Sequence, residues 1–443
     1  MTTKTNVISL KPDRQEEASS VIGPDTRPID VMAFPHLRGY KPLTTIPNVQ
    51  FMFERYGIEL RYNVIKKQID FTIPGLDTTL DNRVNVSLTQ LESLAALNGL
   101  NTQSMGAYTE AIADQNQYNP VLEWIESKPW DGFDRVKELC DTLTVKDGYP
   151  IVLKETLVYR WLLSAAAAAY KPGFHARGVL TLQGGQGLGK TSWITALVPP
   201  RELRESVVKL GHHLDASNKD SLLLAVGHWI VEMGELDSSF KKDIARMKGF
   251  ITDSHDKIRR PYAKGESEYQ RRMVMCASVN DEQFLVDPTG NSRFWTVPLT
   301  HINYQHGIDM QQVFAQAKHV VDQGEQWWLN REEEAMLREE NKKHQAVSAI
   351  REMVLDVIIH PEDPRAGKPR KLSASEVLRQ LLQIKAPNNN QSREAGQALR
   401  EFYGEPVGRT GGNAKWNVCI NEKDLYIFDG DDEPGADFED LPF

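Results

Sequence analysis

The chain has 443 residues, of which 40% are hydrophobic and 26% are charged, as in a soluble globular protein with more than one domain. Its net charge of −9 excludes a uniformly basic nucleic-acid-binding protein. However, seven acids and no bases lie between residues 429 and 443, so the rest of the chain is nearly neutral and can still bind a phosphate backbone.

The cysteines and the apolar runs exclude further classes. Cys140, Cys276 and Cys419 are far apart and lack CxxC spacing, which argues against a disulfide framework and a zinc ribbon. The longest apolar run, around residues 161–169, is too short to cross a bilayer, and the first twenty residues contain no signal-peptide segment. We therefore expect a cytoplasmic protein without a membrane partner.

Changes in the sequence pattern divide the chain into five segments. We expect residues 1–26 to be disordered and residues 27–117 to form a small mixed region of unknown role. Residues 118–345 begin with helical patterns and continue with short apolar runs separated by helices, which indicates an α/β core. Residues 346–428 form a separate C-terminal module, and residues 429–443 form an acidic tail.

Apolar spacing predicts the main elements on either side of that core. It indicates a helix over residues 48–56, a strand over residues 59–71 and a helix over residues 152–170. After the core, residues 331–344 form a charged helix with a solvated face. Residues 347–358 form an amphipathic helix whose apolar stripe we assign to a core.

The C-terminal module combines two helices with a strand. Ser373 and Glu376 form a capping box at the start of one helix, and a second helix is predicted over residues 392–403. A glycine pair at 411–412 precedes an alternating strand around residues 416–420. This order resembles a winged helix-turn-helix, so the module is either a binding surface for duplex DNA or a small packing domain.

A phosphate-binding motif stands at the start of the core. A short apolar strand at residues 180–182 leads into the sequence GGQGLGKT and then into a helix over residues 192–197. Glycines allow successive backbone N–H groups to face an anion, Lys190 can reach the β and γ phosphates, and the Thr191 hydroxyl can bind Mg²⁺. The residues predicted to bind ATP are Gly184, Gly185, Gln186, Gly187, Leu188, Gly189, Lys190, Thr191 and Ser192.

Acidic and polar residues follow at the ends of later predicted strands. The strand at residues 229–231 ends in Glu232, which we assign to Mg²⁺ binding and catalysis, while Glu235 can share the catalytic role. Asn280 follows another strand and can orient water against the γ-phosphate. Arg293 is the candidate arginine finger for a neighbouring subunit.

A basic stretch lies between these acids and Asn280. It contains the predicted DNA-binding residues Arg259, Arg260, Tyr262 and Lys264, and residues 259–263 can pair with 268–273 as a hairpin. Cations follow phosphates and an aromatic ring stacks on bases, as single-stranded DNA requires. Some of these arginines can instead contact ATP. The alternative to DNA binding is a solvated hairpin without a ligand. His212, His213 and Asp215 lack a further ligand, so we do not assign a metal site to them.

Five motifs in order carry a family resemblance: GGQGLGKT, WIVEMGELD, IRRPYAK, ASVN and GNSRFW. With NPVLEWIESKPWDGFDRV upstream and GEQWWLNREEE downstream, residues 118–345 resemble the virulence-associated protein E family. These are phage, prophage and satellite proteins related to superfamily 3 replicative helicases. The resemblance does not extend to residues 1–110 or to the C-terminal module.

The resemblance implies an α/β fold with a P-loop AAA+-like ATPase core, here with a helical N-terminal extension and a small winged-helix-like C-terminal domain. It also implies a ring, expected to be a hexamer, with ATP and Mg²⁺ at the subunit interfaces and single-stranded DNA in the pore. Lys264 would lie on a pore loop and Arg293 would act in trans. One departure is that Glu232 and Glu235 are separated, whereas superfamily 3 proteins often carry adjacent acids at this strand, so the identity of the catalytic acid stays open.

The C-terminal tail carries a second resemblance. The final residues, Asp437, Phe438, Glu439, Asp440, Leu441, Pro442 and Phe443, resemble the tip of bacterial single-stranded-DNA-binding proteins. Acids can dock on a basic rim while the terminal Phe ring enters an apolar pocket. We interpret the tail as a means of recruiting host proteins that read that tip; a solvating tail is the alternative.

Together these patterns predict an ATP-dependent replicative DNA helicase of a phage or mobile element, acting in the cytoplasm of a bacterial host. It would act as a ring on single-stranded DNA and contact duplex origin DNA through its C-terminal domain. One alternative is a ring ATPase that remodels nucleic-acid or protein complexes without unwinding. Another is an adaptor that recruits host replication proteins through the tail. The sequence leaves the polarity, the origin sequence and the ring size open.

Overall fold

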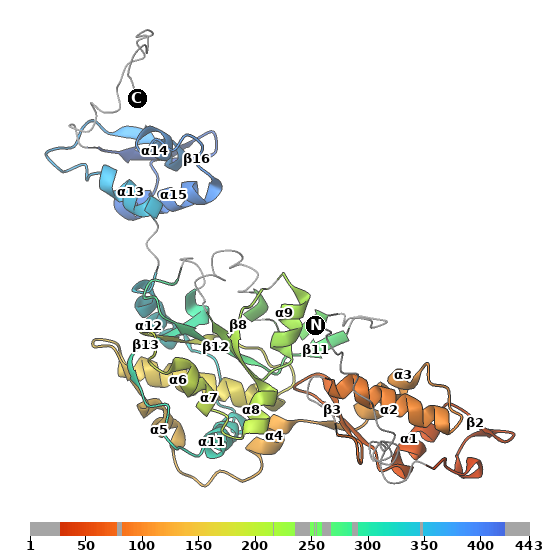
Figure 1. Cartoon of the computed structure of the whole chain (residues 1–443). Coiled ribbons are helices and arrows are strands. Elements are labelled where there is room, and N and C mark those ends of the chain that lie inside the picture. The colour runs from red at the N-terminus through yellow and green to blue at the C-terminus, as the bar shows by residue number, and fades with distance from the viewer. Residues whose placement is uncertain are drawn as a thin grey trace, which may run out of the picture. The chain divides into compact units, whose positions relative to one another are not determined.

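The computed structural model describes most of the chain (Figure 1). The described residues are 27–77, 82–215, 217–234, 249–251, 253, 255–258, 267–285, 291–345 and 349–420. The chain divides into two compact units: Met1–Glu282 with Gly290–Asn341, and Gln283–Thr289 with Lys342–Phe443. The predicted disordered start at 1–26 and the acidic tail at 429–443 lie outside the described residues.

The first part of unit 1 has a hydrophobic core of its own, which includes Val49, Phe53, Leu60 and Leu91. Its elements are a 3-10 helix at Val31–Ala33, β1 (Leu37–Arg38), β2 (Lys41–Pro42), α1 (Ile46–Arg55), β3 (Glu59–Asn63), β4 (Gln68–Thr72), α2 (Arg83–Leu97), α3 (Met105–Asp114) and β5 (Gln117–Tyr118). Strand β3 pairs antiparallel with β4 and parallel with β5. The predicted helix over residues 48–56 is thus confirmed as α1.

The strand character predicted over residues 59–71 is confirmed, but the stretch is divided by a turn into the hairpin β3–β4. Asn63 causes the turn, because its side-chain oxygen accepts hydrogen bonds from the backbone of Ile65 and Lys66, both at 3.1 Å. Lys67 then adopts the left-handed conformation, with φ of 58°. The alternation of apolar residues continues through the turn, so periodicity alone did not reveal it.

The core of unit 1 is a six-stranded sheet in the order β6-β13-β7-β12-β9-β8. Its strands are β6 (Leu143–Val145), β7 (Val179–Gln183), β8 (Val208–His212), β9 (Ile230–Gly234), β12 (Val274–Val279) and β13 (Phe294–Ile302). Only β6 runs antiparallel to its neighbour; the other pairs are parallel. The predicted α/β class is therefore confirmed, and the carboxyl ends of β7, β9 and β12 lie at one edge.

Helices cover this sheet. They are α4 (Pro120–Ile125), α5 (Arg135–Asp141), α6 (Ile151–Tyr170), α7 (Lys190–Ala196), α8 (Arg201–Val207), α9 (Lys219–Val226), α11 (Met310–Asp322) and α12 (Arg331–Lys342). Helix α6, predicted over residues 152–170, is almost entirely buried. The indole N–H of Trp161 donates to the carbonyl of Met275 at 2.8 Å, and that of Trp229 donates to Ala165 at 2.8 Å, so hydrogen bonds tie α6 to β12 and to the start of β9. Among the described residues, no helix is long and apolar enough to span a membrane.

The described part of unit 2 that follows the core contains three helices and a three-stranded antiparallel sheet. Its elements are α13 (Ala349–Val357), β14 (Arg370–Leu372), α14 (Ala374–Gln380), α15 (Asn389–Tyr403), β15 (Gly408–Thr410) and β16 (Asn413–Val418). The sheet order is β14-β16-β15. Gly411 and Gly412 have φ of 57° and 83°, which suits the two-residue turn between β15 and β16. The predicted alternation is confirmed, since Trp416, Val418 and Ile420 are all buried.

Both α14 and α15 begin with capping boxes. The predicted pair Ser373 and Glu376 is confirmed at α14. Helix α15 begins at Asn389, three residues before its predicted start, because Asn388 and Gln391 form a second box. This box was missed because its polar residues precede the first apolar position of the helix.

We expect Gly178→Ala to destabilise unit 1 by about 3 kcal/mol. A Cβ at residue 178 would lie 2.1 Å from the indole of Trp295, which is 2% exposed and cannot move aside. Urea unfolding measures the change. Gly396→Ala in α15 is the matched control, because its Cβ would lie 3.6 Å from Ala374, and we expect it to stabilise its unit by about 0.5–1 kcal/mol. Equal effects of both substitutions would contradict the packing described.

The ion pair between Lys415 and Glu376 makes the stability of unit 2 pH-dependent. Lys415 donates to Glu376 at 2.7 Å and, with the backbone of Ser373, lowers the pKa of this carboxyl from 4.5 to about 2. Because the folded pKa is depressed, the stabilisation is full above pH 4.5 and is lost as the pH falls towards 2. Glu376→Gln should therefore lower the Tm at pH 7, and the difference from wild type should close by about pH 2. A difference that is constant over this range would exclude the ion pair as its cause.

Candidate nucleotide-binding site

A glycine-rich loop connects the end of β7 at Gln183 to the start of α7 at Lys190. Gly187 and Gly189 have φ of 81° and 94°, a conformation that favours glycine. Side chains are also excluded by contact: a Cβ on Gly184 would lie 2.7 Å from the carbonyl oxygen of Leu299. One on Gly189 would lie 2.5 Å from the ring of Tyr304. The strand–loop–helix context predicted for residues 184–192 is therefore confirmed.

Lys190 lies at the mouth of this loop and is 6% exposed. Its amine donates to the carbonyls of Gly184 at 2.6 Å and Gly185 at 2.9 Å, and to Oδ1 of Asn280 at 3.0 Å. Burial lowers the pKa of Lys190, and the negative charge of Glu232 partly opposes that shift. The arrangement holds a desolvated amine against neutral oxygens, where an anion would be a stronger partner.

Glu232 is 2% exposed and accepts three hydrogen bonds. The Thr191 hydroxyl donates to its Oε1 at 2.7 Å, the Ser278 hydroxyl to the same oxygen at 2.5 Å, and the backbone N–H of Gly211 to Oε2 at 3.2 Å. The prediction that Glu232 ends its strand is wrong. Strand β9 runs from Ile230 to Gly234 because Met233 and Gly234 still pair with β12.

Asn280 follows β12 directly, and its bond to Lys190 brings it into the same cluster as Thr191 and Glu232. Sequence reasoning missed Ser278 and Gly211. Ser278 could have been found, because it lies two residues before Asn280 and residues two apart in a strand share a face. Gly211 contributes only its backbone N–H, so nothing in its residue type indicated the contact.

Arg293 lies apart from this cluster within its own chain. It ends the 3-10 helix Asn291–Arg293 at the amino end of β13, where Phe294 pairs with Val179 at the start of β7. The glycine-rich loop follows the other end of β7, one strand of five residues away, which is about 16 Å. The Nε of Arg293 is buried, and it has no hydrogen-bond partner among the residues that the structure describes.

Several predicted site residues lie outside the described residues. They are Glu235, Arg259, Arg260, Tyr262, Lys264, Asp437, Phe438, Glu439, Asp440, Leu441, Pro442 and Phe443. On either side of the basic stretch, β10 (His255–Ile258) pairs antiparallel with β11 (Ser267–Gln270). Pairing of chain segments around this stretch was predicted, although the paired residues described here differ from those expected.

The donor set at the loop suits a hydrated divalent cation and phosphate. Thr191 and Glu232 supply hydroxyl and carboxylate oxygens, the ligand types that Mg²⁺ prefers. The glycine-rich loop and Lys190 supply donors for anionic oxygens. Within the described part of the chain, no group of three or more His, Cys, Asp or Glu residues could hold a metal ion.

The fold and the site define an α/β protein in which a glycine-rich loop and a buried carboxylate meet at one edge of a mostly parallel sheet. Residues 125–346, half of the chain, match the model of the virulence-associated protein E-like domain. The chain therefore belongs to this family, as its motifs predicted.

Comparison with curated proteins gave no match. Among solved structures, the chain is similar to "The apo structure of NrS-1 C terminal region (305-718)", at 13% identity and a TM-score of 0.34, covering 84% of this chain and 98% of that one. It is also similar to "The A form apo structure of NrS-1 C terminal region-CTR(305-718)", at 12% identity, a TM-score of 0.32 and the same coverage.

Proposed function

We propose that this protein is an ATPase of phage or mobile-element replication: an ATP-dependent DNA helicase that acts as a ring on single-stranded DNA in the bacterial cytoplasm. The observation that carries the proposal is the convergence of Lys190, Thr191, Glu232 and Asn280 at one sheet edge, linked by hydrogen bonds of 2.7 to 3.0 Å. Membership of the virulence-associated protein E-like family supports it.

The strand order supports the finer assignment to a P-loop AAA+-like core. Strand β12 lies between β7, which leads into the glycine-rich loop, and β9, which carries Glu232. This extra strand places Asn280 between the loop and the acid, so a polar group faces the space where a terminal phosphate would lie. A small-molecule kinase could also bind ATP with a glycine-rich loop. Such an enzyme would not require Asn280 after β12 or Arg293 before β13.

The residues present fit ATP with Mg²⁺. Bound ATP would supply the phosphoanhydride bond whose hydrolysis releases the free energy for movement along DNA. The loop amides and the Lys190 amine would hold the phosphates, since among the described residues that amine donates to neutral oxygens, with which an anion would compete favourably. Thr191 and Glu232 would hold the metal ion, and Asn280 would orient water.

Glu232 is our candidate for the catalytic acid. Ser278 and Gly211 fix its carboxylate from two neighbouring strands, so its orientation is set before any ligand binds. Glu235, three residues later in the sequence, is the alternative catalytic acid. It lies outside the described residues.

Arg293 supports assembly into a ring, for which we propose a hexamer. Its backbone lies about one strand length from the glycine-rich loop of its own chain, so we infer that it would act on the nucleotide of a neighbouring subunit. An arginine supplied in this way stabilises the charge that develops on a transferred phosphoryl group. In such a ring, Arg259, Arg260, Tyr262 and Lys264 would contact single-stranded DNA.

ATPase activity with and without single-stranded DNA tests the proposal. We expect DNA to stimulate the wild-type protein and Lys190→Ala to abolish both activity and stimulation, because the phosphates lose their cation. Lys219→Ala is the matched control: Lys219 also begins a helix, α9, but its side chain is exposed, whereas that of Lys190 is buried. It should behave as wild type.

Strand displacement then separates the alternatives. DNA-stimulated hydrolysis without unwinding would favour a ring ATPase that remodels complexes. ATP hydrolysis that DNA does not stimulate would overturn the helicase assignment and favour an adaptor that recruits host proteins through residues 437–443. In that case the Lys190→Ala variant should still bind those partners.

A further inference from the structure

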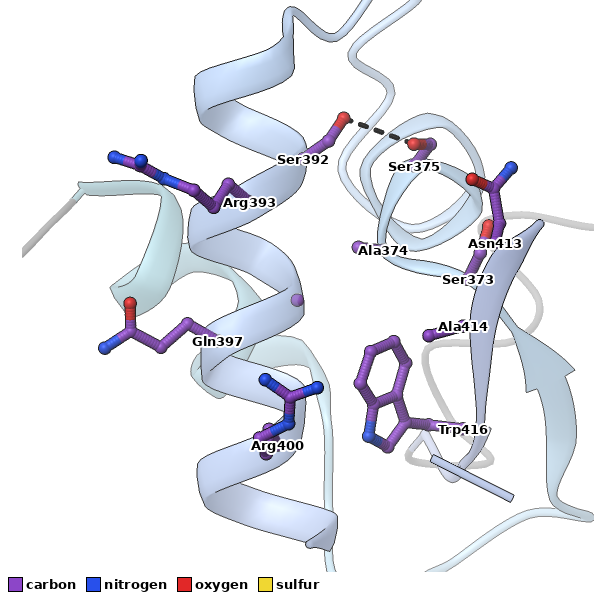
Figure 2. A pocket seen from close by; sticks show the side chains of 11 residues that line it. Ser373, Ala374, Ser375, Ser392, Arg393, Gln397, Arg400, Asn413, Ala414 and Trp416 are labelled. Carbon is purple, nitrogen blue, oxygen red and sulfur yellow. Dashed lines mark hydrogen bonds between the residues drawn. The ribbon is translucent and has the colours of Figure 1, made fainter. Parts of the chain in front are cut away.

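Helix α15 presents a row of basic and amide side chains. Arg393, Gln397 and Arg400 have the spacing i, i+4 and i+7, which places them along one side of the helix (Figure 2). The opposite side, with Ala395, Ala398 and Leu399, is completely buried in the core of unit 2. The row is therefore held in place by a rigid core, without being part of it.

A groove runs beside this row, between α15, α14 and β16 (Figure 2). Its volume is about 580 Å³, and its apolar lining includes Ala374, Gly396 and Trp416. One hydroxyl comes from each helix: Ser375 donates to Ser392 at 3.2 Å. Gly396 keeps the groove open, because it has no side chain between the two helices.

The acids near this surface have partners of their own. Glu401 pairs with Arg351 of α13 at 2.9 Å and also accepts from Gln397 at 3.4 Å. Glu405 pairs with Arg400 at 3.5 Å, and Glu376 pairs with Lys415 at 2.7 Å. Arg393 is exposed and forms no ion pair among the described residues. Residues 349–420 contain eleven Lys and Arg against eight Asp and Glu, so this module is basic in a chain of net charge −9.

We propose that this surface binds duplex DNA, with α15 in the major groove and Arg393, Gln397 and Arg400 contacting base edges. An α-helix fits that groove, and arginine and glutamine are side chains that recognise guanine and adenine there. The element order helix–strand–helix–helix–strand–strand is that of a winged helix, which uses its third helix in this way. Ser375, Ser392 and the exposed Arg409 of β15 are placed to contact the phosphates.

The chemistry of the surface favours duplex DNA over single-stranded DNA. Single strands are held by aromatic rings with free faces. The ring of the groove, Trp416, is 4% exposed, and its indole N–H donates to the Gly404 carbonyl at 3.0 Å. It is therefore a structural side chain with no face available for a base.

The test is selection of sequences from a random duplex pool of about 30 base pairs by the full-length protein without ATP, followed by affinity measurements on the enriched duplex. Arg393→Ala and Gln397→Ala should each weaken binding to that duplex about tenfold or more, with a smaller effect on random duplex. Arg365→Ala is the control, because Arg365 is 70% exposed and pairs locally with Asp363, outside the groove. It should change the affinity less than twofold.

Lys190→Ala separates this proposal from the proposed ATPase, because it should bind the enriched duplex as wild type does. All variants are first checked for wild-type circular dichroism and Tm, since Arg393 is exposed but Gln397 is half-buried. The proposal is overturned if no sequence is enriched, if an acidic peptide or single-stranded DNA competes for the surface better than the enriched duplex, or if Arg365→Ala weakens binding as much as Arg393→Ala.

Discussion

The buried carboxylate of Glu232 is the constraint on which the core of this molecule depends. A charge that is 2% exposed is strongly destabilising unless hydrogen bonds compensate it. The donors come from three different elements: Thr191 of α7, Ser278 of β12 and Gly211 of β8. Satisfying one carboxylate therefore requires β9 to lie between β8 and β12, with α7 above them, and this is the observed strand order.

The same constraint prepares the site for phosphate. With Thr191 bound to Glu232, the first turn of α7 is fixed against the sheet, and Lys190, one residue earlier, is directed back over the glycine-rich loop. Its amine is desolvated there, and Gly187 and Gly189 adopt the positive φ angles that the loop requires. Buried contacts also fix the proposed DNA surface on α15. The apolar face of this helix packs in the core and so holds its polar row at the surface.

Much of this arrangement could be predicted from the sequence where the determinants are local. The glycine-rich loop needs glycines and a lysine at fixed spacing, and the Ser373 capping box is read from residues three apart. The rest depends on contacts between distant residues. Pairing of Gly234 with Ser278 sets the end of β9, and the side chain of Asn63 causes the β3–β4 turn. The backbone N–H of Gly211 donates one of the hydrogen bonds that hold Glu232. None of these leaves a periodic signal.

The most direct measurement of the central claim is Mg²⁺–ATP binding and turnover in Glu232→Gln. Glutamine keeps the shape and its oxygen can still accept bonds from Thr191 and Ser278, but it lacks the negative charge and loses the bond from the Gly211 N–H. We expect the variant to bind nucleotide within about tenfold of wild type, while turnover falls by about 10²- to 10⁴-fold, because proton transfer and metal orientation are lost. Turnover within twofold of wild type would show that Glu232 only holds the fold together, and would contradict its assignment to the chemistry.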